Sequence, residues 1–345
     1  MSKILLGLDI GTHTIKCVQL SREKEITALL AAGYIPTPIS SISSNTQNDE
    51  KVIAGSINRL VHDMKVSTTD VVVSLPSSKV ITRVVQIPIM SEKELDSSIQ
   101  WEAEQYIPWQ LSQVKIDYDI ILRDESAGKM SVLMVAAPII LIEKYMRLIT
   151  LSGLNPIALE PDILAVTRVI SEGFETLPNI LVASIGATTT DIALIRDKIL
   201  IYTKSYPVGG STLTKAIAEE LGFEASQAEE YKKTYGFEED KLEGKIAKIL
   251  MPYFTNILNE MEKTITYFKE QYPKEEIKLA VINGGTARIP QLMTLMTKNI
   301  GIDSQISNPL SVLSIDPNIL PIVSPDSPIY TTAVGLAMKE VEYLI

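Results

Sequence analysis

The segment GLDIGTHTIKCVQL at residues 7–20 joins two strand-like apolar runs through a Gly-Thr-His-Thr turn. The first run carries a carboxylate, Asp9, and the second carries an ammonium, Lys16. The turn is neither a P-loop nor a dinucleotide-binding fingerprint, because GxxxxGK(S/T) and GxGxxG are absent and a second strand follows instead of a helix. A glycine in such a turn allows close approach of a ligand, and successive N–H groups can form an anion-binding nest.

This hairpin is therefore predicted to bind phosphate groups. Its candidate residues are Asp9, Gly11, Thr12, His13, Thr14 and Lys16. Lys16 would reach phosphate oxygens as a compact positive charge, and Asp9 would bind magnesium, commonly through water. The alternative is an exposed hairpin with a surface lysine and an aspartate in an Asx-type turn, and this turn alone does not decide between the two.

A second hairpin of the same kind follows 175 residues later, since Ile10 falls on Ile185 and Gly11 on Gly186. Residues 4–35 and 180–208 both predict a strand, a turn, a strand, a short turn and a strand. The second set of candidates is Gly186, Ala187, Thr188 and Thr189. The pattern predicts one unit used twice, with two hairpins holding one phosphate chain in a cleft between related domains. The alternative is that any two three-stranded meanders can be aligned.

Three further segments suit a nucleotide, and their candidate residues are Gly209, Gly210, Glu229, Lys232, Gly284, Gly285 and Thr286. The first glycine pair precedes a helix whose free N–H groups would face an anion. The glutamate and lysine share a helix face and would hold ribose hydroxyls. The Gly-Gly-Thr segment follows a strand and would let a flat base approach the backbone. Plainer interpretations are a helix start, an exposed ion pair and an ordinary strand-to-helix turn.

Composition limits the classes of function. The 345 residues suggest two domains, and a hydrophobic content of 46% allows sizeable cores. The net charge of −10 argues against binding nucleic acid or an anionic membrane surface, since both need basic patches. The only cysteine, Cys17, excludes a disulfide framework and fits a reducing compartment. The longest apolar stretch, residues 132–142, is far shorter than the about 20 residues of a membrane span, and no signal peptide is visible, so a soluble cytoplasmic protein is expected.

Strands that alternate with helices indicate the α/β class. Helices are expected at about residues 51–65, 91–107 and 139–152, within residues 211–272, and near residues 290–300. Ser91 and Glu94 would form a capping box, and Pro108 would end the second of these helices. A polar, Ser/Pro-rich loop is expected at residues 36–50.

The segments LDIGTHTIK, ASIGATTTD, VGG, AEEYK and INGGTARIP occur in the order found in the actin/Hsp70/sugar-kinase ATPase superfamily. Within it, the chain resembles the FtsA-related PilM family of type IV pilus assembly over essentially its whole length, and WEAEQYIPW is the more specific segment. The resemblance implies an actin-like ATPase fold, with two duplicated RNase H-like domains and a small inserted α+β subdomain. The implied divisions are residues 1–178 with an insert at about 80–145, residues 179–345 with a helical subdomain at about 215–275, and a helix at about 331–345 that returns to the first domain.

The resemblance also implies that ATP, or ADP, binds between the domains with Mg²⁺. Asp9, residues 11–14 and Lys16 would form the first phosphate motif, and residues 186–189 the second. The Glu-Lys pair would then bind ribose, and the Gly-Gly-Thr segment would lie near adenine.

One position departs from the superfamily pattern. The second phosphate motif usually opens with an aspartate, whereas this chain has Ser184. A hydroxyl carries no negative charge, so magnesium binding and water activation should both weaken. Asp191, on the strand beyond the turn, would compensate only if its side chain points back. We therefore expect nucleotide binding with slow or absent hydrolysis, and we assign no catalytic residue.

PilM proteins bind the short cytoplasmic tail of PilN, an inner-membrane protein, in a groove between the first subdomain and the inserted one. The resemblance implies the same partner, contacts with other pilus assembly proteins, and a cytoplasmic location held at the inner membrane by a protein. Trp101, Tyr106 and Trp109 would line such a groove, because aromatic residues are enriched at binding hot spots. On an amphipathic helix, Trp101 and Tyr106 would equally serve as core residues.

Two other functions stay open at this point. A sugar-kinase-like phosphotransferase would need a catalytic base facing an acceptor hydroxyl, and no motif announces one. An FtsA-like filament-forming division protein would typically end in a linker and a basic amphipathic membrane helix, whereas this chain stops at AMKEVEYLI, with two glutamates against one lysine. Self-association also stays open, since a head-to-tail interface needs only complementary patches.

Overall fold

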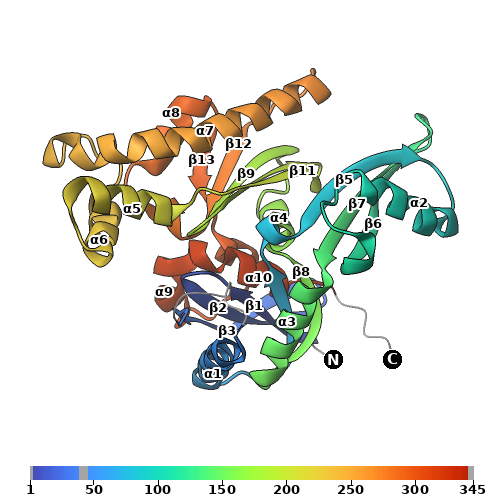
Figure 1. Cartoon of the computed structure of the whole chain (residues 1–345), viewed down its shortest axis with the longest axis horizontal. Coiled ribbons are helices and arrows are strands. Elements are labelled where there is room, and N and C mark those ends of the chain that lie inside the picture. Colours follow the sequence, from blue (N-terminus) through green and yellow to red (C-terminus); the bar gives the residue numbers. More distant parts are fainter. Residues whose placement is uncertain (1–2, 39–45, 341–345) are drawn as a thin grey trace.

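The computed structural model describes residues 3–38 and 46–340. It is built on two five-stranded sheets and one three-stranded sheet (Figure 1). The first sheet has the order β3-β2-β1-β4-β8 and contains β1 (Lys3–Ile10), β2 (Thr14–Glu23), β3 (Ile26–Pro36), β4 (Asp70–Leu75) and β8 (Asn155–Pro161). The second has the order β11-β10-β9-β12-β13 and contains β9 (Asn179–Ile185), β10 (Thr190–Arg196), β11 (Ile199–Tyr206), β12 (Leu279–Asn283) and β13 (Asp303–Ile306).

The two five-stranded sheets repeat one design. In each, three strands joined by short turns run antiparallel, and two strands from later in the chain add in parallel beside the first strand. β1 and β9 lie in the middle of their sheets and are largely buried, which explains their nearly continuous apolar runs. The predicted α/β class, the strand–turn–strand segments and the duplication are therefore confirmed.

A smaller antiparallel sheet, here called the inserted sheet, occupies the chain between β4 and β8. Its order is β5-β7-β6, and it contains β5 (Ile81–Pro88), β6 (Val114–Asp124) and β7 (Lys129–Pro138). Leu95, Ile99 and Ala103 of α2 (Glu92–Glu104) pack into the core of this sheet at the spacing of one helix face. The predicted capping box is confirmed, because the Ser91 hydroxyl accepts from the Glu94 N–H and the Glu94 carboxylate accepts from the Ser91 N–H.

Further helices lie around the two large sheets. They are α1 (Gln47–Asp63), α3 (Ile139–Leu151), α4 (Asp162–Gly173), α5 (Gly210–Leu221), α6 (Ala225–Tyr235), α7 (Lys245–Gln271), α8 (Leu292–Ile300), α9 (Leu320–Val323) and α10 (Thr331–Ala337). Short 3₁₀ segments occupy Ser77–Lys79, Leu111–Gln113, Leu242–Gly244, Gly285–Arg288, Pro309–Val312 and Ser324–Tyr330. Within residues 3–38 and 46–340, no helix combines the length and the apolar character that a bilayer crossing requires.

The predicted helices are confirmed, with shifted ends. α2 ends at Glu104 rather than near residue 107, three residues before the position that Pro108 restricts. α1 begins at Gln47, inside the region predicted as a loop, and residues 39–45 of that loop lie outside the described residues.

The last helix is shorter than predicted. α10 ends at Ala337, so the expected helix over residues 331–345 is wrong for residues 338–340, while residues 341–345 lie outside the described residues. Lys339 instead reaches Glu160 at 2.7 Å, a carboxylate that is only 4% exposed. The buried Glu160 carboxylate is thus paired with both Lys339 and Arg168.

Two helices, α4 and α10, lie between the large sheets (Figure 1). α10 packs on β1 and on α4, and α4 packs on β9 and β10. The approach is close: a Cβ at Gly7 would lie 2.0 Å from the Ala333 carbonyl oxygen, and one at Gly335 would lie 2.0 Å from the Ala165 carbonyl oxygen. The first sheet with α1 and α3, here the first lobe, thus meets the second sheet with α5–α8, the second lobe, through a tightly packed helical layer.

Candidate functional site

The first hairpin brings its two charges together. Asp9 and Lys16 stand opposite each other in the β1–β2 register, and Lys16 Nζ lies 2.9 Å from Asp9 Oδ2. Ser74, near the end of β4, donates to Asp9 Oδ1 at 2.9 Å. The side chains are 15% exposed for Lys16 and 14% for Asp9. The sequence indicated both charges at this turn, but the register makes each the partner of the other.

Two hydrogen bonds from Thr37 stabilise the turn between β1 and β2. The Thr37 hydroxyl donates to the Gly11 carbonyl at 2.7 Å, and the Thr37 N–H donates to the His13 carbonyl at 2.9 Å. Lys16 Nζ would lie 2.9 Å from a Cβ placed on Gly11, so the ammonium sits directly over the turn. The exposed tip of the turn consists of Thr12 and His13.

The second hairpin repeats the first in atomic detail. The Gly186 N–H donates to the Thr189 carbonyl at 2.9 Å, as the Gly11 N–H does to the Thr14 carbonyl at 3.0 Å. Thr188 is exposed at the tip, like its counterpart His13 in the first hairpin. Two turns of the same geometry therefore project from the carboxyl ends of β1 and β9.

The Gly209-Gly210 segment packs against this second hairpin. The Gly210 N–H donates to the Gly186 carbonyl at 2.9 Å, and the Ser211 N–H donates to the Ala187 carbonyl at 2.8 Å. A Cβ at Gly209 would lie 2.7 Å from both of these carbonyl oxygens. Only glycine lets the start of α5 approach the hairpin this closely.

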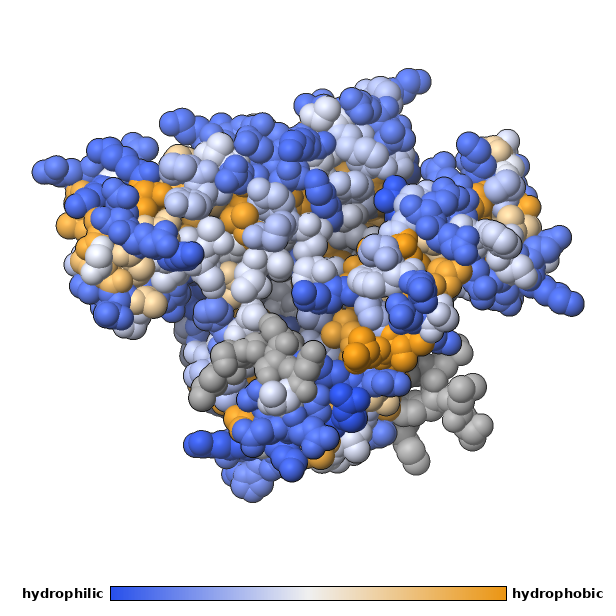
Figure 2. All heavy atoms as spheres, in the orientation of Figure 1, coloured by the Kyte–Doolittle hydropathy of each residue, from blue (hydrophilic) through white to orange (hydrophobic). Residues whose placement is uncertain are grey.

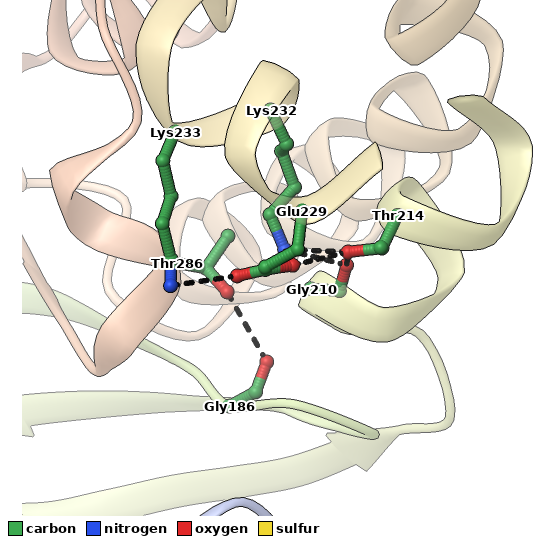
Figure 3. A network of polar contacts seen from close by, with 7 residues as sticks. All are labelled: Gly186, Gly210, Thr214, Glu229, Lys232, Lys233 and Thr286. Atoms are coloured by element: carbon green, nitrogen blue, oxygen red, sulfur yellow. Dashed lines mark hydrogen bonds and ion pairs between the residues drawn. The ribbon is translucent and has the colours of Figure 1, made fainter. Parts of the chain in front are cut away.

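Figure 3 shows the polar network that links α5, α6 and the second hairpin. Lys232 is 5% exposed, and its ammonium donates to Glu229 at 2.5 Å, Thr214 at 2.8 Å and the Gly210 carbonyl at 3.0 Å. These three bonds use all three N–H groups of the ammonium. Lys232 therefore holds α5 and α6 together, a role that the spacing of the pair in the sequence did not reveal.

Glu229 is the exposed end of this network. Its side chain is 35% exposed, and Lys233 pairs with its second oxygen at 3.2 Å. Burial alone would raise the pKa of Glu229, but hydrogen bonds from Lys232 and Thr214 outweigh it and lower this pKa. Glu229 is thus a stable carboxylate that accepts hydrogen bonds at the surface of the second lobe.

The Gly284-Gly285-Thr286 segment closes the other side of the second hairpin. Gly284 has φ 89°, and a Cβ there would lie 2.4 Å from the Ile185 carbonyl oxygen. The Thr286 hydroxyl donates to the Gly186 carbonyl at 3.3 Å. No atom lies within 4 Å of the position that a Cβ on Gly285 would occupy, so the space beside this residue is open. The structure thus brings together the candidates of the second lobe.

Asp162, which the sequence analysis missed, connects the two hairpins. It is the first residue of α4 and accepts hydrogen bonds from the Ser77 hydroxyl and the Ser77 N–H. Its pKa is raised well above the usual range by burial and by the nearby carboxylates of Asp191 and Asp9. The charges of Asp9 and Asp191 therefore act on the carboxyl group at the start of α4. The signal in the sequence was an acidic residue directly after Glu-Pro at the end of a strand.

The Asp191 carboxylate is buried and incompletely paired. It is 5% exposed, and its Oδ1 has no hydrogen-bond partner among the described residues. Burial raises its pKa to about 6. The folded protein therefore holds this proton more tightly than the unfolded chain between about pH 4 and 6, and stability falls as pH rises through that window.

Asp191→Asn is expected to raise the free energy of unfolding by about 1–3 kcal/mol near neutral pH, because the penalty for a buried charge disappears. The gain should be much smaller at about pH 4.5, where the wild-type carboxyl is largely protonated. Urea unfolding at the two pH values measures both. Asp197→Asn, on a side chain that is 61% exposed, is the matched control and should change little. An equal gain at both pH values would contradict the raised pKa.

Unpaired polar atoms gather around the second hairpin. Ser211 Oγ and Asn283 Nδ2 are buried without a hydrogen-bond partner among the described residues. Because buried polar atoms are normally hydrogen-bonded, these two retain capacity for a polar ligand or water. In the described part of the chain, no group of three or more His, Cys, Asp or Glu is placed to hold a metal ion. A magnesium ion here would have to take most of its ligands from phosphate and water.

The three aromatic candidates for partner binding do not share one exposed surface. Trp101 on α2 is 72% exposed, whereas Tyr106 and Trp109 pack against the core of the inserted sheet. Arg83 covers the Tyr106 ring at 3.9 Å from its centroid. The buried stripe of α2 runs through Leu95, Ile99 and Ala103, and this periodicity already puts Trp101 outside the core.

The repeated sheet order, the helical layer between the sheets and the paired glycine hairpins define a protein with the actin-like ATPase fold. The model of the family described as "Type IV pilus assembly protein PilM" matches residues 7–341, and the chain belongs to this family.

Individual relatives agree with this assignment. A chain of the "PilM-PilN type IV pilus biogenesis complex" is 25% identical, with a TM-score of 0.87 over 98% of this chain and 99% of that chain. MreB5 of Spiroplasma citri bound to AMPPNP is 13% identical, with a TM-score of 0.54 over 96% and 94%, and shows the shared fold alone. The cell division protein FtsA of Escherichia coli (strain K12) is 27% identical over 183 residues, 46% of this chain. That match spans 42% of FtsA, less than half of its length.

Proposed function

We propose that this protein is a cytoplasmic ATP-binding scaffold of type IV pilus assembly that binds the short cytoplasmic tail of a PilN-like inner-membrane protein. The observation that carries the proposal is the likeness to a chain of the PilM–PilN complex over 98% of this chain. Such a tail would hold the protein at the inner membrane, where other pilus assembly proteins would join it.

The phosphates of ATP would lie between the two hairpins. Lys16 would turn toward a phosphate oxygen, while the N–H groups and hydroxyls of the turns at residues 11–14 and 186–189 would donate to others. Asp9 keeps its hydrogen bond from Ser74 in this arrangement and would bind Mg²⁺ through water. The metal, when bound, would neutralise phosphate charge.

The nucleoside would lie on the second lobe. Glu229 would accept hydrogen bonds from the ribose hydroxyls, with Lys232 fixing its position. The open surroundings of Gly285 leave room for the base against the backbone. ADP would fit the same contacts except those to the last phosphate.

Bound ATP is expected to turn over slowly or not at all. Ser184 stands opposite Asp191 in the β9–β10 register, so the aspartate does occupy a neighbouring position. However, the Asp191 carboxylate is only 5% exposed and its Oδ1 is buried, which makes it a poor replacement for an exposed metal-binding aspartate. Asp9 alone would then supply negative charge at the phosphates.

The surface proposed for the PilN-like tail is the start of α3, where β7 leads from the inserted sheet into the first lobe. Ile139 and Ile140 are 39% and 72% exposed there, and Met146 of the same helix is 39% exposed. Figure 2 shows hydrophobic atoms gathered at this place, where α3 begins in Figure 1. A peptide with an apolar face would bind here by burying these exposed side chains. Trp101 stays the alternative anchor.

Contacts between the inserted sheet and the second lobe would couple nucleotide binding to binding of the PilN-like tail. β5 packs against β11, and Leu133 of β7 packs against the second-lobe core that contains Leu200. A change in the angle between the lobes would therefore move the inserted sheet relative to α3. ATP would alter tail affinity to the extent that it prefers one lobe arrangement.

Calorimetric titration of a peptide from the cytoplasmic tail of the neighbouring PilN-like protein tests the proposal. Ile140→Asp is expected to weaken tail binding about tenfold or more, because it puts a charge into an apolar contact. Lys16→Ala is expected to weaken ATP binding about 10- to 100-fold through loss of a charge-assisted bond, and to remove any effect of ATP on tail binding. Nucleotide recovered from the wild-type complex should be unhydrolysed ATP.

The controls separate the two surfaces. Trp101→Ala should leave tail binding unchanged if the tail lies on α3. A loss of tail binding in this variant alone would indicate that the tail binds on α2 instead. Unchanged tail binding in both variants would refute the proposed surface on α3. Rapid single-turnover hydrolysis of ATP would refute its role as a bound, unhydrolysed part of the scaffold.

A further inference from the structure

A second concave site lies at the opposite end of β1 from Asp9. It is a cavity of about 400 Å³. Its lining residues are Lys3, Leu5, Leu20, Arg22, Lys24, Thr27, Ala337, Met338, Lys339 and Glu340. Leu5, Leu20 and Ala337 are buried and form an apolar floor, whereas the charged residues form the rim. The volume lies in the range of pockets that enclose small organic molecules.

The rim is basic in an acidic protein. Four of its side chains are cationic and one is anionic, although the chain carries a net charge of −10. Such a local reversal of sign concentrates anions at a cavity. The tail after α10 contributes to this rim, so the feature depends on two parts of the chain that are more than three hundred residues apart.

One carboxylate of the chain already forms an ion pair with a cation of the rim. Glu340 Oε1 lies 2.6 Å from Arg22 Nη1, and these side chains are 79% and 45% exposed. An exposed ion pair of this kind contributes little stability, so a competing anion can displace Glu340. Lys339, by contrast, is bound to the buried Glu160, which Arg168 also holds, and it fixes one wall of the cavity.

Lys24 stands at a position where turn geometry does not favour lysine. It opens the two-residue turn between β2 and β3, with φ 54°, where glycine, asparagine or aspartate is preferred. The equivalent turn of the second lobe opens with Asp197, a residue type that tolerates this geometry. Lysine also has positive φ at Lys65 and Lys198, so the geometry of Lys24 is not unusual in this chain, and its relevance here is its position on the rim of the cavity.

We propose that this cavity binds an organic anion: a phosphate or carboxylate carried on an apolar body. The anionic group would contact Arg22 and Lys24 in place of Glu340, and the apolar body would lie on Leu5, Leu20 and Met338. Two sources supply this chemistry, an anionic lipid headgroup with its acyl chain and a free amphiphilic metabolite. The site is separate from the nucleotide site and does not depend on it.

The test titrates octyl phosphate into the full-length protein labelled with ¹³C at the methionine methyl groups. The Met338 signal is expected to shift, and octyl glucoside and inorganic phosphate are expected to bind at least about tenfold more weakly, because each lacks one half of the ligand. The double variant Arg22→Gln/Lys24→Gln should lose about tenfold or more in affinity. Lys198→Gln, in the equivalent turn of the second lobe, is the matched control and should bind like wild type.

Vesicles separate the two sources. Binding to phosphatidylglycerol vesicles but not to phosphatidylcholine vesicles, lost in the double variant, supports the proposal with a lipid as ligand. Binding of octyl phosphate without vesicle binding supports it with a free amphiphile as ligand. An unmoved Met338 signal, or wild-type affinity in a double variant that still binds ATP, overturns the proposal.

Discussion

Replacement of Gly335 by alanine is expected to lower the free energy of unfolding by about 3 kcal/mol or more. The added Cβ would lie 2.0 Å from the carbonyl oxygen of Ala165 and 2.5 Å from its carbonyl carbon. Both atoms belong to the backbone of α4, so no side chain can rotate away and a helix must move. α10 also touches β1 at Gly7, so this movement would spread into the first sheet. Urea unfolding followed by circular dichroism measures the change.

The same substitution at Gly55 is the matched control. Gly55 lies inside α1, and no atom stands within 4 Å of a Cβ position there. Alanine is favoured over glycine in a helix interior by about 1 kcal/mol, so Gly55→Ala should stabilise the protein. If Gly335→Ala lowers the free energy of unfolding and Gly55→Ala raises it, the loss at Gly335 comes from the close packing of α10 and not from glycine replacement itself. A Gly335→Ala protein as stable as wild type would contradict the close packing of α10 on α4.

Lys232→Met is the second substitution with a large expected effect. The Lys232 ammonium is buried, and each buried polar group left without its partner costs about 1–3 kcal/mol, although Glu229 keeps its ion pair with Lys233. Here Thr214 and the Gly210 carbonyl would also lose their bonds to the ammonium. We expect a loss of about 3 kcal/mol in unfolding free energy and at least about tenfold weaker ATP binding, since Glu229 would no longer be held in position. Denaturant unfolding and calorimetric titration with ATP measure the two effects.

Lys233→Met is the control for this experiment. Lys233 binds the same carboxylate at 3.2 Å, but its side chain is 69% exposed against 6% for Lys232. Exposed ion pairs contribute about 0–1 kcal/mol, so this variant should remain close to wild type. Similar losses in the two variants would mean that burial of the ammonium is not the source of its effect.

Much of the candidate site was predictable because its signals are local. A glycine followed by a threonine three residues later, between two apolar runs, specifies a hairpin through neighbouring residues alone. The same signal appears at Gly11 and at Gly186, and the structure closes both turns with the same N–H to carbonyl bond. The capping box at Ser91 and Glu94 was predictable for the same reason.

Other features arise only between distant parts of the chain. The carboxylate of Asp191 in the second sheet acts on that of Asp162 in α4, although 29 positions separate them in the sequence. Two of the three hydrogen bonds of Lys232, to Thr214 and to the Gly210 carbonyl, likewise join it to a different helix. No periodicity in the chain encodes such distances.

The sequence by itself determined the strands, the two glycine turns and the repetition of one unit, because each follows from side-chain pattern and backbone preference over a few residues. Only the tertiary structure decided which charges are exposed and which are buried and paired. That choice depends on burial and on partners supplied by other elements, as the exposed Trp101 and the buried Lys232 both show.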